Sequence, residues 1–457
     1  MPRAPTATAG PRPPRRRPRR RGRGPRPAAG GARLGDGRLR AAARTSTVGR
    51  PAGSSRVDHR RGRAVNAADH RGQRPDATLA LPARTGGDAC PGTLRPHPAL
   101  DGSLVRLRLP GGGVDPAALD RLMGLARRHG SPMLQLTSRG NLQVRGLPDP
   151  LPSALVDEVE ALGLLPSRTH ERARGILAVP DPVAQALARQ VDEAVQAQPD
   201  LTELPGRFLT VVSDGSAQLL AERWDLALQV TDPAHIASAG VRVLVAPGHA
   251  VRHAVPPTRA VAELVGLMRA FLRRRPDERT WNVRDLLDPA SLHPDLVPAG
   301  LCPPPPLRPG DCPGPGQLVA AVPLGLLRPQ HTAAFLRAAG DGGRVVLTPW
   351  RSVVLDLGQE EGSESAVRPA ASILADAGLV VGHGSPWARL SACVGAPHCR
   401  RTTSPTLALT AEAAGRVPEH GARVHVVGCG RACGRPQGDH ILVVDPTHPD
   451  QIVQEAR

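Results

Sequence analysis

The sequence contains no lysine and no tyrosine, and only three phenylalanines and four tryptophans among its 457 residues. Aromatic residues make up 2% of the chain, which disfavours recognition of nucleic acid by base stacking. No apolar run approaches the length of about 18 residues that spanning a bilayer requires, so no membrane partner is expected. No apolar core follows the basic N-terminus, as a secretory signal would require, and we expect a cytoplasmic protein with reduced thiols.

The formal net charge of +18 is concentrated at the N-terminus. Residues 1–89 hold 22 arginines and five aspartates, whereas the rest of the chain carries a net charge of +1. This tail is rich in arginine, proline, glycine and alanine, has little to bury, and is expected to be disordered. We interpret it as a solvated extension or the product of a start codon assigned too far upstream. A polyanion-binding arm, which would be the one route to a nucleic-acid partner, and a targeting segment are the alternatives.

Beyond the tail, two segments of the chain share one pattern. In the first, DGSLVRLRLPGG predicts a strand, VDPAALDRLMGLARRHG a helix from Asp115 to Gly130, and MLQLTSRGNLQVRGL a strand, turn and strand. In the second, QLVAAVPLGLL, RPQHTAAFLRAAG and GGRVVLTPWRSVVLDL repeat the same order. Residues 136–144 align without a gap over residues 347–355. We therefore expect an internal duplication with a site between the two halves.

Four of the seven cysteines lie in the last 65 residues, spaced as C-x5-C-x29-C-x3-C. A disulfide is disfavoured because cytosolic thiols stay reduced, and zinc fits the first pair poorly because of its wide spacing. An iron–sulfur cluster uses four thiolates, and nearby glycines together with Arg431 and Arg435 supply N–H donors and positive charge. The spacing therefore favours an iron–sulfur cluster, with zinc and unligated thiols as the alternatives.

These motifs resemble a known family. SACVGAPHC and GCGRACGRP are similar to the cluster-binding signature of sulfite and nitrite reductases, and RLRLPGG and LTSRGNLQVRGL to the first ferredoxin-like repeat of that family. LTPWRSVVL and ACVGAPHC resemble its precorrin-3B synthase branch, the oxygen-dependent enzymes of cobalamin biosynthesis. The resemblance covers roughly Cys90 to the C-terminus. It implies an α+β, internally duplicated nitrite/sulfite reductase-like fold with two ferredoxin-like halves and two α/β halves.

Composition and resemblance together divide the chain into six segments. They are the disordered tail (1–89), the first ferredoxin-like half (90–165), the first α/β half on the tetrapyrrole side (166–300), a Pro-rich linker (301–315), the second ferredoxin-like half (316–380) and the iron–sulfur cluster-binding half (381–457).

The resemblance also implies which residues hold the ligands. A [4Fe-4S] cluster would be bound by the four C-terminal cysteines, which are Cys393, Cys399, Cys429 and Cys433. Four arginines fall where the family directs basic residues at macrocycle carboxylates or at a bound anion: Arg108, Arg139, Arg174 and Arg207. Arg139 and Arg207 are the candidate catalytic residues among them. A guanidinium binds a carboxylate bidentately, but arginine is so abundant here that each position also fits an ordinary ion pair.

One motif of this chain differs from that of the sulfite and nitrite reductases in the family. Sulfite and nitrite reductases carry a basic pair in a motif like L-P-x-K-x-K, whereas this chain has LPGRFL, with Arg207 followed by Leu209. Loss of the second cation weakens binding of a small oxyanion but not of an organic macrocycle. The resemblance to precorrin-3B synthase therefore implies a monooxygenase that hydroxylates precorrin-3A at C20 with O2 and forms a γ-lactone.

The same resemblance implies the partners of the reaction. They are a precorrin, O2, a second non-heme iron that activates oxygen, and a separate reductase or ferredoxin, because no dinucleotide-binding fingerprint follows a strand. The first alternative is a siroheme-dependent ferredoxin nitrite or sulfite reductase. The second is a zinc-stapled RNA-binding protein that uses the basic tail.

Overall fold

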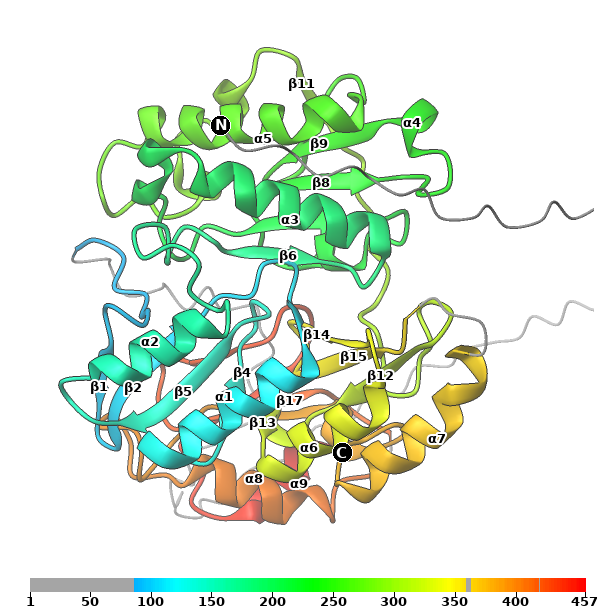
Figure 1. The fold of residues 1–457 in the computed structure, drawn as a ribbon. Helices are drawn as coiled ribbons and strands as arrows, with labels where there is room; N and C mark the ends of the chain where they lie inside the picture. Colours follow the sequence, from blue (N-terminus) through cyan, green and yellow to red (C-terminus); the bar gives the residue numbers. More distant parts are fainter. Residues whose placement is uncertain (1–85, 359–362, 419) are drawn as a thin grey trace, which may run out of the picture. The chain divides into compact units, whose positions relative to one another are not determined.

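The computed structural model describes residues 86–358, 363–418 and 420–457. The expected tail at 1–89 lies outside the described residues except for its last four. The described chain is an α+β protein with four sheets, in which the strand–helix–strand–strand order of the N-terminal half returns in the C-terminal half (Figure 1).

The first ferredoxin-like half contains an antiparallel sheet with one helix following its second strand. Its strands, in the order β1-β2-β5-β4 across the sheet, are β1 (His97–Ala99), β2 (Gly102–Leu107), β5 (Leu142–Leu147) and β4 (Leu134–Leu136). Helix α1 (Pro116–His129) begins where the Asp115 carboxylate accepts a hydrogen bond from the Ala118 N–H at 2.9 Å, and it ends at Gly130. A second helix, α2 (Ser153–Ala161), closes the half.

The second half repeats this arrangement. Its sheet has the strand order β12-β15-β14, made of β12 (Gln317–Ala321), β15 (Ser352–Asp356) and β14 (Arg344–Leu347). Its helices are α6 (Pro329–Ala339) and α7 (Ser363–Asp376). The buried apolar residues of both sheets and of α1 and α6 form one shared core. Helices α1 and α6 pack against each other within it (Figure 1).

Each half also lends a two-residue strand to the other half's sheet. Strand β3 (Gly113–Val114) of the first half pairs with β14, and β13 (Leu326–Leu327) of the second half pairs with β4. The chain approaches β14 closely just before β3, because a Cβ at Gly112 would lie 2.5 Å from the Leu347 carbonyl oxygen. Gly112 also has φ +76°, so the exchange needs glycine there for two reasons. Exchanged strands of equal length are what an internal duplication predicts.

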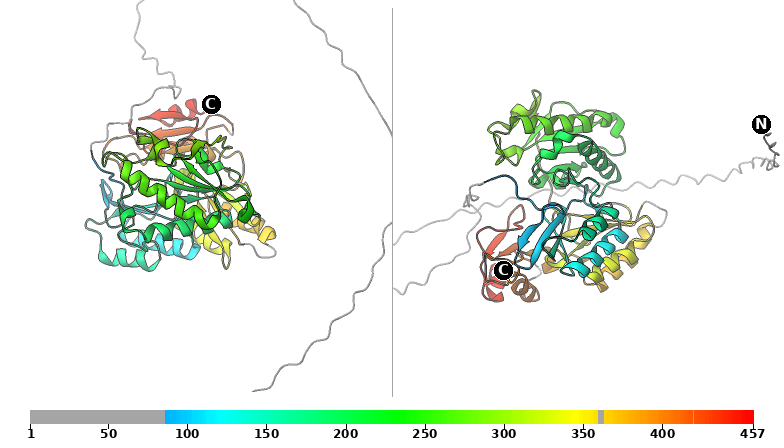
Figure 2. Two further views of the ribbon diagram at one scale, coloured as in Figure 1. Left: turned by 90° about the horizontal axis from the view of Figure 1, so that it is seen from above. Right: turned by 60° about the vertical axis from the view of Figure 1, so that its left-hand side comes forward.

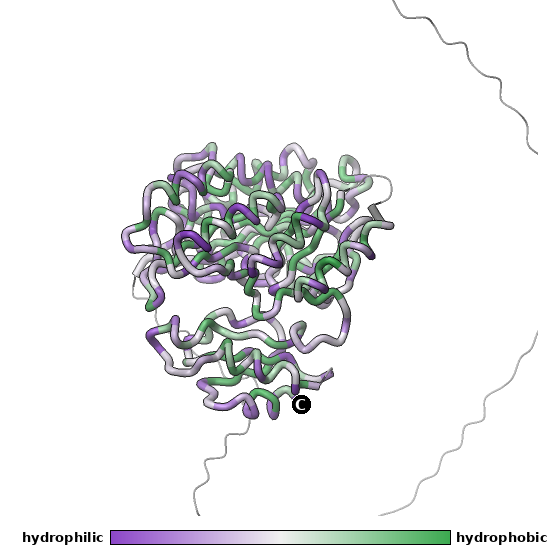
Figure 3. The backbone as a smooth tube through the Cα atoms, turned by 60° about the horizontal axis from the view of Figure 1, so that its bottom comes forward, coloured by the Kyte–Doolittle hydropathy of each residue, from purple (hydrophilic) through white to green (hydrophobic). Residues whose placement is uncertain are grey.

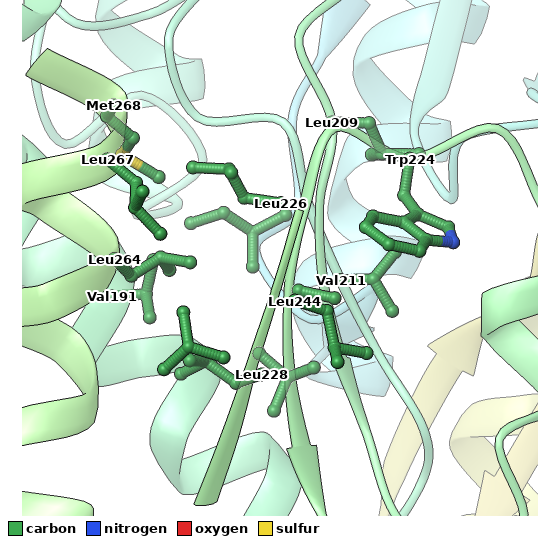
Figure 4. Close-up of a cluster of buried hydrophobic side chains, with 14 of the residues drawn as sticks. Val191, Leu209, Val211, Trp224, Leu226, Leu228, Leu244, Leu264, Leu267 and Met268 are labelled. Carbon is green, nitrogen blue, oxygen red and sulfur yellow. The ribbon is translucent and has the colours of Figure 1, made fainter. Parts of the chain in front are cut away.

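A six-stranded mixed sheet follows the first ferredoxin-like half. Its order is β11-β10-β9-β8-β7-β6, with β11 (Leu296–Pro298), β10 (His249–Val251), β9 (Val241–Val245), β8 (Leu226–Val230), β7 (Thr210–Ser213) and β6 (Ile176–Ala178). Its helices are α3 (Pro182–Gln196), α4 (Ile236–Ala239) and α5 (Pro257–Arg274). Figure 4 shows Leu264 and Leu267 of α5 on one side of the strands and Val211 and Trp224 on the other. The strands are therefore packed with apolar residues on both faces.

The four C-terminal cysteines belong to a separate three-stranded parallel sheet, drawn in orange and red in Figure 2. Its strands, in order, are β16 (Leu390–Ala392), β17 (Val424–Val427) and β18 (Ile441–Val444). Helices α8 (Thr406–Ala414) and α9 (Pro449–Glu455) pack on it. The strands of this sheet are short and its apolar core is small. The four cysteines lie in the loops outside the strands.

Hydropathy follows these layers. Hydrophobic stretches of the tube in Figure 3 gather where strands and helices face one another, whereas hydrophilic stretches are frequent in outer loops. Residues 301–315, expected to be a linker, contain no helix or strand. No described helix combines the length and the apolar character that a membrane span requires.

A histidine at the start of α6 provides a stability test. His331 is 4% exposed, and its Nδ1 accepts a hydrogen bond from the Arg328 N–H at 3.1 Å. Burial, reinforced by the charge of Arg328, lowers the pKa of His331 to about 4. Because this folded-state pKa is below the unfolded value of about 6.5, the stabilisation is complete above pH 6.5 and is lost as pH falls toward 4. We expect the free energy of unfolding to fall by up to about 1.4 kcal/mol per pH unit in that window from this group.

The substitution His331→Gln keeps an acceptor at this capping position and removes the titration. Denaturant unfolding between pH 4 and 7 is therefore expected to be less pH-dependent in His331→Gln than in the wild type. The exposed residue His253, replaced by Gln, is the matched control and should leave the slope unchanged. Equal slopes for the wild type and His331→Gln would contradict the assignment.

Candidate metal centre and adjoining cavity

The cysteines lie at the ends of adjacent parallel strands. Cys393 directly follows β16, and Cys429 follows β17 after Gly428. The Cys393 N–H donates to the Val426 carbonyl at 2.8 Å, so the first cysteine continues the β16–β17 ladder. Because the carboxyl ends of parallel strands meet at one edge of a sheet, the two cysteine pairs are brought to the same edge.

Backbone N–H groups point at two of the sulfur atoms. The Gly428 N–H donates to Cys393 Sγ at 3.4 Å, and the Arg401 N–H donates to Cys399 Sγ at 3.5 Å. Such N–H···S contacts stabilise negative charge on sulfur, which is the form that binds metal. The donor set therefore fits an anionic, sulfur-bound cofactor.

The four thiols also act on one another electrostatically. Loss of solvent raises the pKa of Cys433, Arg431 lowers it, and the charges of Cys393, Cys429 and Cys399 raise it further. No group of three or more His, Cys, Asp or Glu in the described part is gathered tightly enough to hold one metal ion. Four thiolates can bind either a single tetrahedral zinc, with Zn–S bonds of about 2.3 Å, or a four-iron cluster, in which each iron takes its own sulfur.

The same finding bears on the expected second iron. Within the described residues, no His, Cys, Asp or Glu side chains are gathered in a set that would ligate it. The second iron therefore stays a prediction without assigned ligands.

A buried histidine holds the last cysteine in place. His425 of β17 is fully buried, with Nδ1 accepting from the Ser391 hydroxyl at 2.8 Å and Nε2–H donating to the Cys433 carbonyl at 3.1 Å. Burial, followed by the charge of Arg351, lowers the pKa of His425 to about 3. The imidazole is therefore neutral at pH 7 and acts as a fixed hydrogen-bonding bridge from the sheet to the Cys433 loop.

The two other histidines near the cysteines contact different groups. His440 Nε2 accepts from Arg435 Nε at 3.0 Å, and its Nδ1–H donates to the Gly438 carbonyl at 2.8 Å. His398 Nδ1 lies 3.2 Å from an Asp101 carboxylate oxygen in the first half. Both imidazoles are therefore engaged by local hydrogen-bonding groups.

Arg351 links the second-half turn to the same loop. It has φ +57°, an uncommon conformation for a residue with a side chain, and its Nη2 donates to the Gly434 carbonyl at 2.6 Å. The side chain passes Gly325, where a Cβ would lie 3.0 Å from Arg351 Cγ. Burial, reinforced by the charge of Arg423, lowers the pKa of Arg351 to about 10, and the group remains a cation at pH 7. A fixed positive charge therefore lies against the backbone of Gly434, the residue that follows Cys433.

A cavity of about 460 Å³, partly open to solvent, lies beside Arg351. Its wall includes Ser138 of the first-half turn, Trp350 and Arg351 of the equivalent second-half turn, and residues from both ends of the cysteine-bearing segment. The basic and acidic side chains in the wall are Glu222, Arg351, Arg389 and Arg423. The equivalent turns of the two halves thus meet the cysteine-bearing sheet at one cavity, where the duplication predicts a site.

Three of the four expected arginines come together next to Gly206. Arg108 is 2% exposed, with Nη2 donating to Cys90 Sγ at 3.3 Å and to the Gly206 carbonyl at 3.4 Å. Arg139 Nη1 donates to the carbonyl of Arg207. The exposed Arg207 side chain lies 3.5 Å from Asp88 and 5.0 Å from the ring centre of Trp281.

Arg106 is a further basic residue in this group, and the sequence did not single it out. Its Nη1 donates to Cys90 Sγ at 2.9 Å. Burial lowers the pKa values of Arg108 and Arg139, and the nearby charges of Cys90, Asp88 and Asp225 oppose that shift. Four arginines lie near three carboxyl groups, those of Asp88, Glu171 and Asp225, so the group keeps an excess of positive charge that suits an anion.

Arg174, the fourth expected arginine, is engaged elsewhere. Its Nε and Nη2 donate to both carboxylate oxygens of Asp192 at 2.7 and 2.8 Å, and the Arg174 side chain is 5% exposed. This buried bidentate pair neutralises the charge and occupies the Nε/Nη2 edge of the guanidinium. The geometry gives Arg174 a structural contact in place of an open anion-binding position.

Sequence reasoning also missed the residues around the cavity. Glu222 and Arg423 belong to no motif that the sequence analysis singled out, and Trp350 and Arg351 lie in LTPWRSVVL, which was used for the resemblance but not as a site. A signal did exist for two of them, because the gapless alignment of 136–144 with 347–355 places Trp350 and Arg351 opposite Arg139 and Gly140. Transferring the expected site residues of the first repeat to the aligned positions of the second would have identified Trp350 and Arg351.

The comparisons with known proteins agree with this architecture. Residues 97–162 match the model of the nitrite/sulfite reductase ferredoxin-like half domain. The comparison with curated proteins found no match. Among solved structures, that of the Mycobacterium tuberculosis NirA protein is similar, with a TM-score of 0.57 and 17% identity over 73% of this chain and 69% of that chain. The predicted fold class is therefore confirmed, and the chain carries a nitrite/sulfite reductase ferredoxin-like half domain within a fold that it shares with NirA.

Proposed function

We propose that this chain is an iron–sulfur oxidoreductase that acts on a tetrapyrrole bearing several carboxylates. The observation that carries the proposal is the contact between Arg351 and the Gly434 carbonyl, which joins a basic cavity to the loop of Cys433. An inorganic cofactor on the cysteines and an acidic organic ligand in the cavity would then be neighbours.

Four residues would hold a [4Fe-4S] cluster: Cys393, Cys399, Cys429 and Cys433. The N–H groups on Cys393 and Cys399 and the His425 bridge to Cys433 support this assignment. When bound, such a cluster supplies single electrons to the neighbouring site. The chain's own contribution is to fix the sulfurs, keep His425 neutral and hold Arg351 beside them.

The ligand would be held by charge at more than one place. Arg106, Arg108, Arg139 and Arg207 form one basic group, and the cavity adds Arg351, Arg389 and Arg423. A precorrin carries acetate and propionate groups around its rim, so widely spaced arginines suit it. Arg139 and Arg207 remain the proposed catalytic residues, because Arg207 is exposed and Arg139 contacts its backbone.

Two observations favour a precorrin over a small oxyanion as the substrate. Leu209 is 2% exposed within the core of the six-stranded sheet (Figure 4), so this position supplies no cation. Arg174 is neutralised by Asp192. A small anion thereby has fewer positive groups to bind, and we propose a precorrin-3B synthase-type monooxygenase. One oxygen atom of O2 would enter precorrin-3A at C20 with γ-lactone formation, and the other would leave as water with two electrons and two protons from a donor.

The second candidate is a siroheme-dependent nitrite or sulfite reductase. The match of residues 97–162 to the half domain of that family favours it. Under this alternative, siroheme would occupy the space proposed for the precorrin, and Arg207 would face the bound anion.

The electrons would come from a separate protein. Arg400, Arg401 and Arg431 are exposed beside three of the cysteines, and exposed positive charge suits docking of an acidic ferredoxin or reductase. We propose a cytoplasmic location, because thiols that assemble an iron–sulfur cluster must stay reduced.

Turnover under labelled oxygen tests the choice between the two reactions. The purified chain, given precorrin-3A, 18O2 and a reduced ferredoxin, is expected to yield a product carrying one labelled oxygen, analysed by mass spectrometry. Its visible spectrum is expected to show only a broad cluster shoulder. A siroheme Soret band, with nitrite or sulfite consumed and the precorrin unchanged, would establish the alternative instead.

A further inference from the structure

The cavity beside Arg351 contains more positive charge than its surroundings neutralise. Arg351, Arg389 and Arg423 line it, and in the described part of the chain none of them forms an ion pair. Glu222 is the one carboxyl group in the wall. The cavity therefore has a net positive charge that an incoming anion would balance.

Each of these arginines donates hydrogen bonds to backbone carbonyls. Arg423 Nη1 donates to the Gln437 carbonyl at 3.3 Å, and Arg351 Nη2 donates to the Gly434 carbonyl. Arg389 donates to the carbonyls of Ala422 and Pro418, while its Nε is buried and has no hydrogen-bond partner. A guanidinium has five N–H donors, so Arg423 and Arg351 in particular keep donors for a ligand.

These cations are only partly shielded from solvent. Arg351, Arg389 and Arg423 are half-buried, and loss of solvent is the largest cause that lowers their pKa values. The single acidic neighbour compensates little, because burial also raises the pKa of Glu222, whose carboxylate oxygen accepts from Trp350 Nε1–H at 2.7 Å. A partly shielded cation gains from a hydrogen-bonded anionic partner, and the described wall offers these three arginines only Glu222.

The wall also carries apolar surface suited to a flat ring. Trp350 and Trp387 both line the cavity and are half-buried, and they are two of only four tryptophans in the chain. The space of about 460 Å³ between these side chains includes open solvent, so a ligand would enter it from the surface of the molecule. Indole faces beside guanidinium groups match a conjugated ring whose rim carries carboxylates.

We propose that this cavity is a carboxylate subsite, in which Arg423 and Arg351 bind acidic side chains of the macrocycle while Trp350 and Trp387 contact its ring. The proposal rests on the tetrapyrrole function above and assigns to it residues outside the Arg106, Arg108, Arg139 and Arg207 group. The two basic groups would bind different edges of one ligand. Glu222 lies near both groups, because the charges of Arg423 and Arg139 both lower the pKa of its carboxyl group.

Binding of two porphyrins to the anaerobically purified holoprotein tests this subsite. The probes are uroporphyrin, which has a carboxylate on every side chain, and coproporphyrin, which has fewer. Binding is followed by tryptophan quenching and by porphyrin absorbance at fixed ionic strength. Arg423→Gln is expected to weaken uroporphyrin binding by about tenfold, the effect of one lost charge-assisted contact, and coproporphyrin binding by less. Arg423→Lys should lie between Arg423→Gln and the wild type.

Arg416→Gln is the matched control, because Arg416 is an exposed arginine of the same segment that pairs with Asp450. It should leave both affinities unchanged. Iron content and thermal stability of each variant are measured in parallel, and if Arg423→Gln does not fold, Arg423→Lys carries the test. Equal uroporphyrin affinities of the Arg423 variants and the wild type would overturn the subsite and leave the proposed function standing. A wild-type chain that binds neither porphyrin would contradict the proposed function and the subsite together.

Discussion

The substitution Cys429→Ser is expected to abolish cluster assembly, reducing iron and acid-labile sulfide to background. A serine hydroxyl is a poor iron ligand in place of a thiolate. The remaining cysteines are Cys90, buried under Arg106 and Arg108, and Cys302 and Cys312, both exposed. Iron and sulfide analysis, with the visible spectrum of anaerobically purified protein, measures the outcome.

Cys312→Ser is the matched control for that experiment. Its thiol is exposed, and its one hydrogen-bonding contact is with the Gly310 carbonyl at 3.9 Å. The control is expected to retain full iron and sulfide. Full cluster content in Cys429→Ser would show that this thiol is not a ligand.

The largest effect on stability is expected from Asp192→Asn. This change removes the charge that neutralises Arg174 while keeping the size of the side chain, and the Arg174 side chain is 5% exposed. A buried cation left without its partner costs about 3–5 kcal/mol. Asp192 also accepts from Gln196 Nε2 at 2.8 Å, so the substitution disturbs a network. At roughly 2–4 °C per kcal/mol, we expect a fall of at least about 6 °C in the unfolding temperature.

The exposed pair Arg128–Glu158 provides the comparison. Its side chains are 56% and 47% exposed, and such pairs contribute about 0–1 kcal/mol. Thermal unfolding of Glu158→Gln should therefore lie within about 4 °C of the wild type. If Asp192→Asn unfolds at the same temperature as Glu158→Gln, the Arg174–Asp192 pair is not structural, and Arg174 would again be a candidate for the ligand site.

Local signals predicted the regular elements well. The helix after Asp115 begins at Pro116 and ends at Gly130 as expected, because an N-cap, a first-turn proline and a terminal glycine each act within a few residues. The alignment of 136–144 over 347–355 corresponds to β4–β5 and β14–β15. The exchange of β3 and β13 gave no signal, since two residues are too few for any periodicity and their partners lie in the other half. The segment QLVAAVPLGLL, expected as one strand, is divided into β12 and β13 by a short turn at Pro323–Gly325.

The candidate site was predicted only in part, because a motif built on a rare residue type is more informative than one built on an abundant type. The cysteines are rare, so their spacing is informative, and the structure brings the strands before Cys393 and Cys429 side by side. Arginine, by contrast, is the only strongly basic residue type in the chain, and its presence in a motif does not distinguish a ligand contact from an ion pair. Arg174 was expected at the ligand site but is paired with Asp192. Arg351 was not expected there but reaches the Cys433 loop.

The most direct test of the account is the metal and sulfide content of the anaerobically purified chain. A [4Fe-4S] cluster on the four C-terminal cysteines predicts four irons and four sulfides per chain, with an absorbance that bleaches on reduction. Zinc bound without sulfide, or no bound metal at all, would contradict the account.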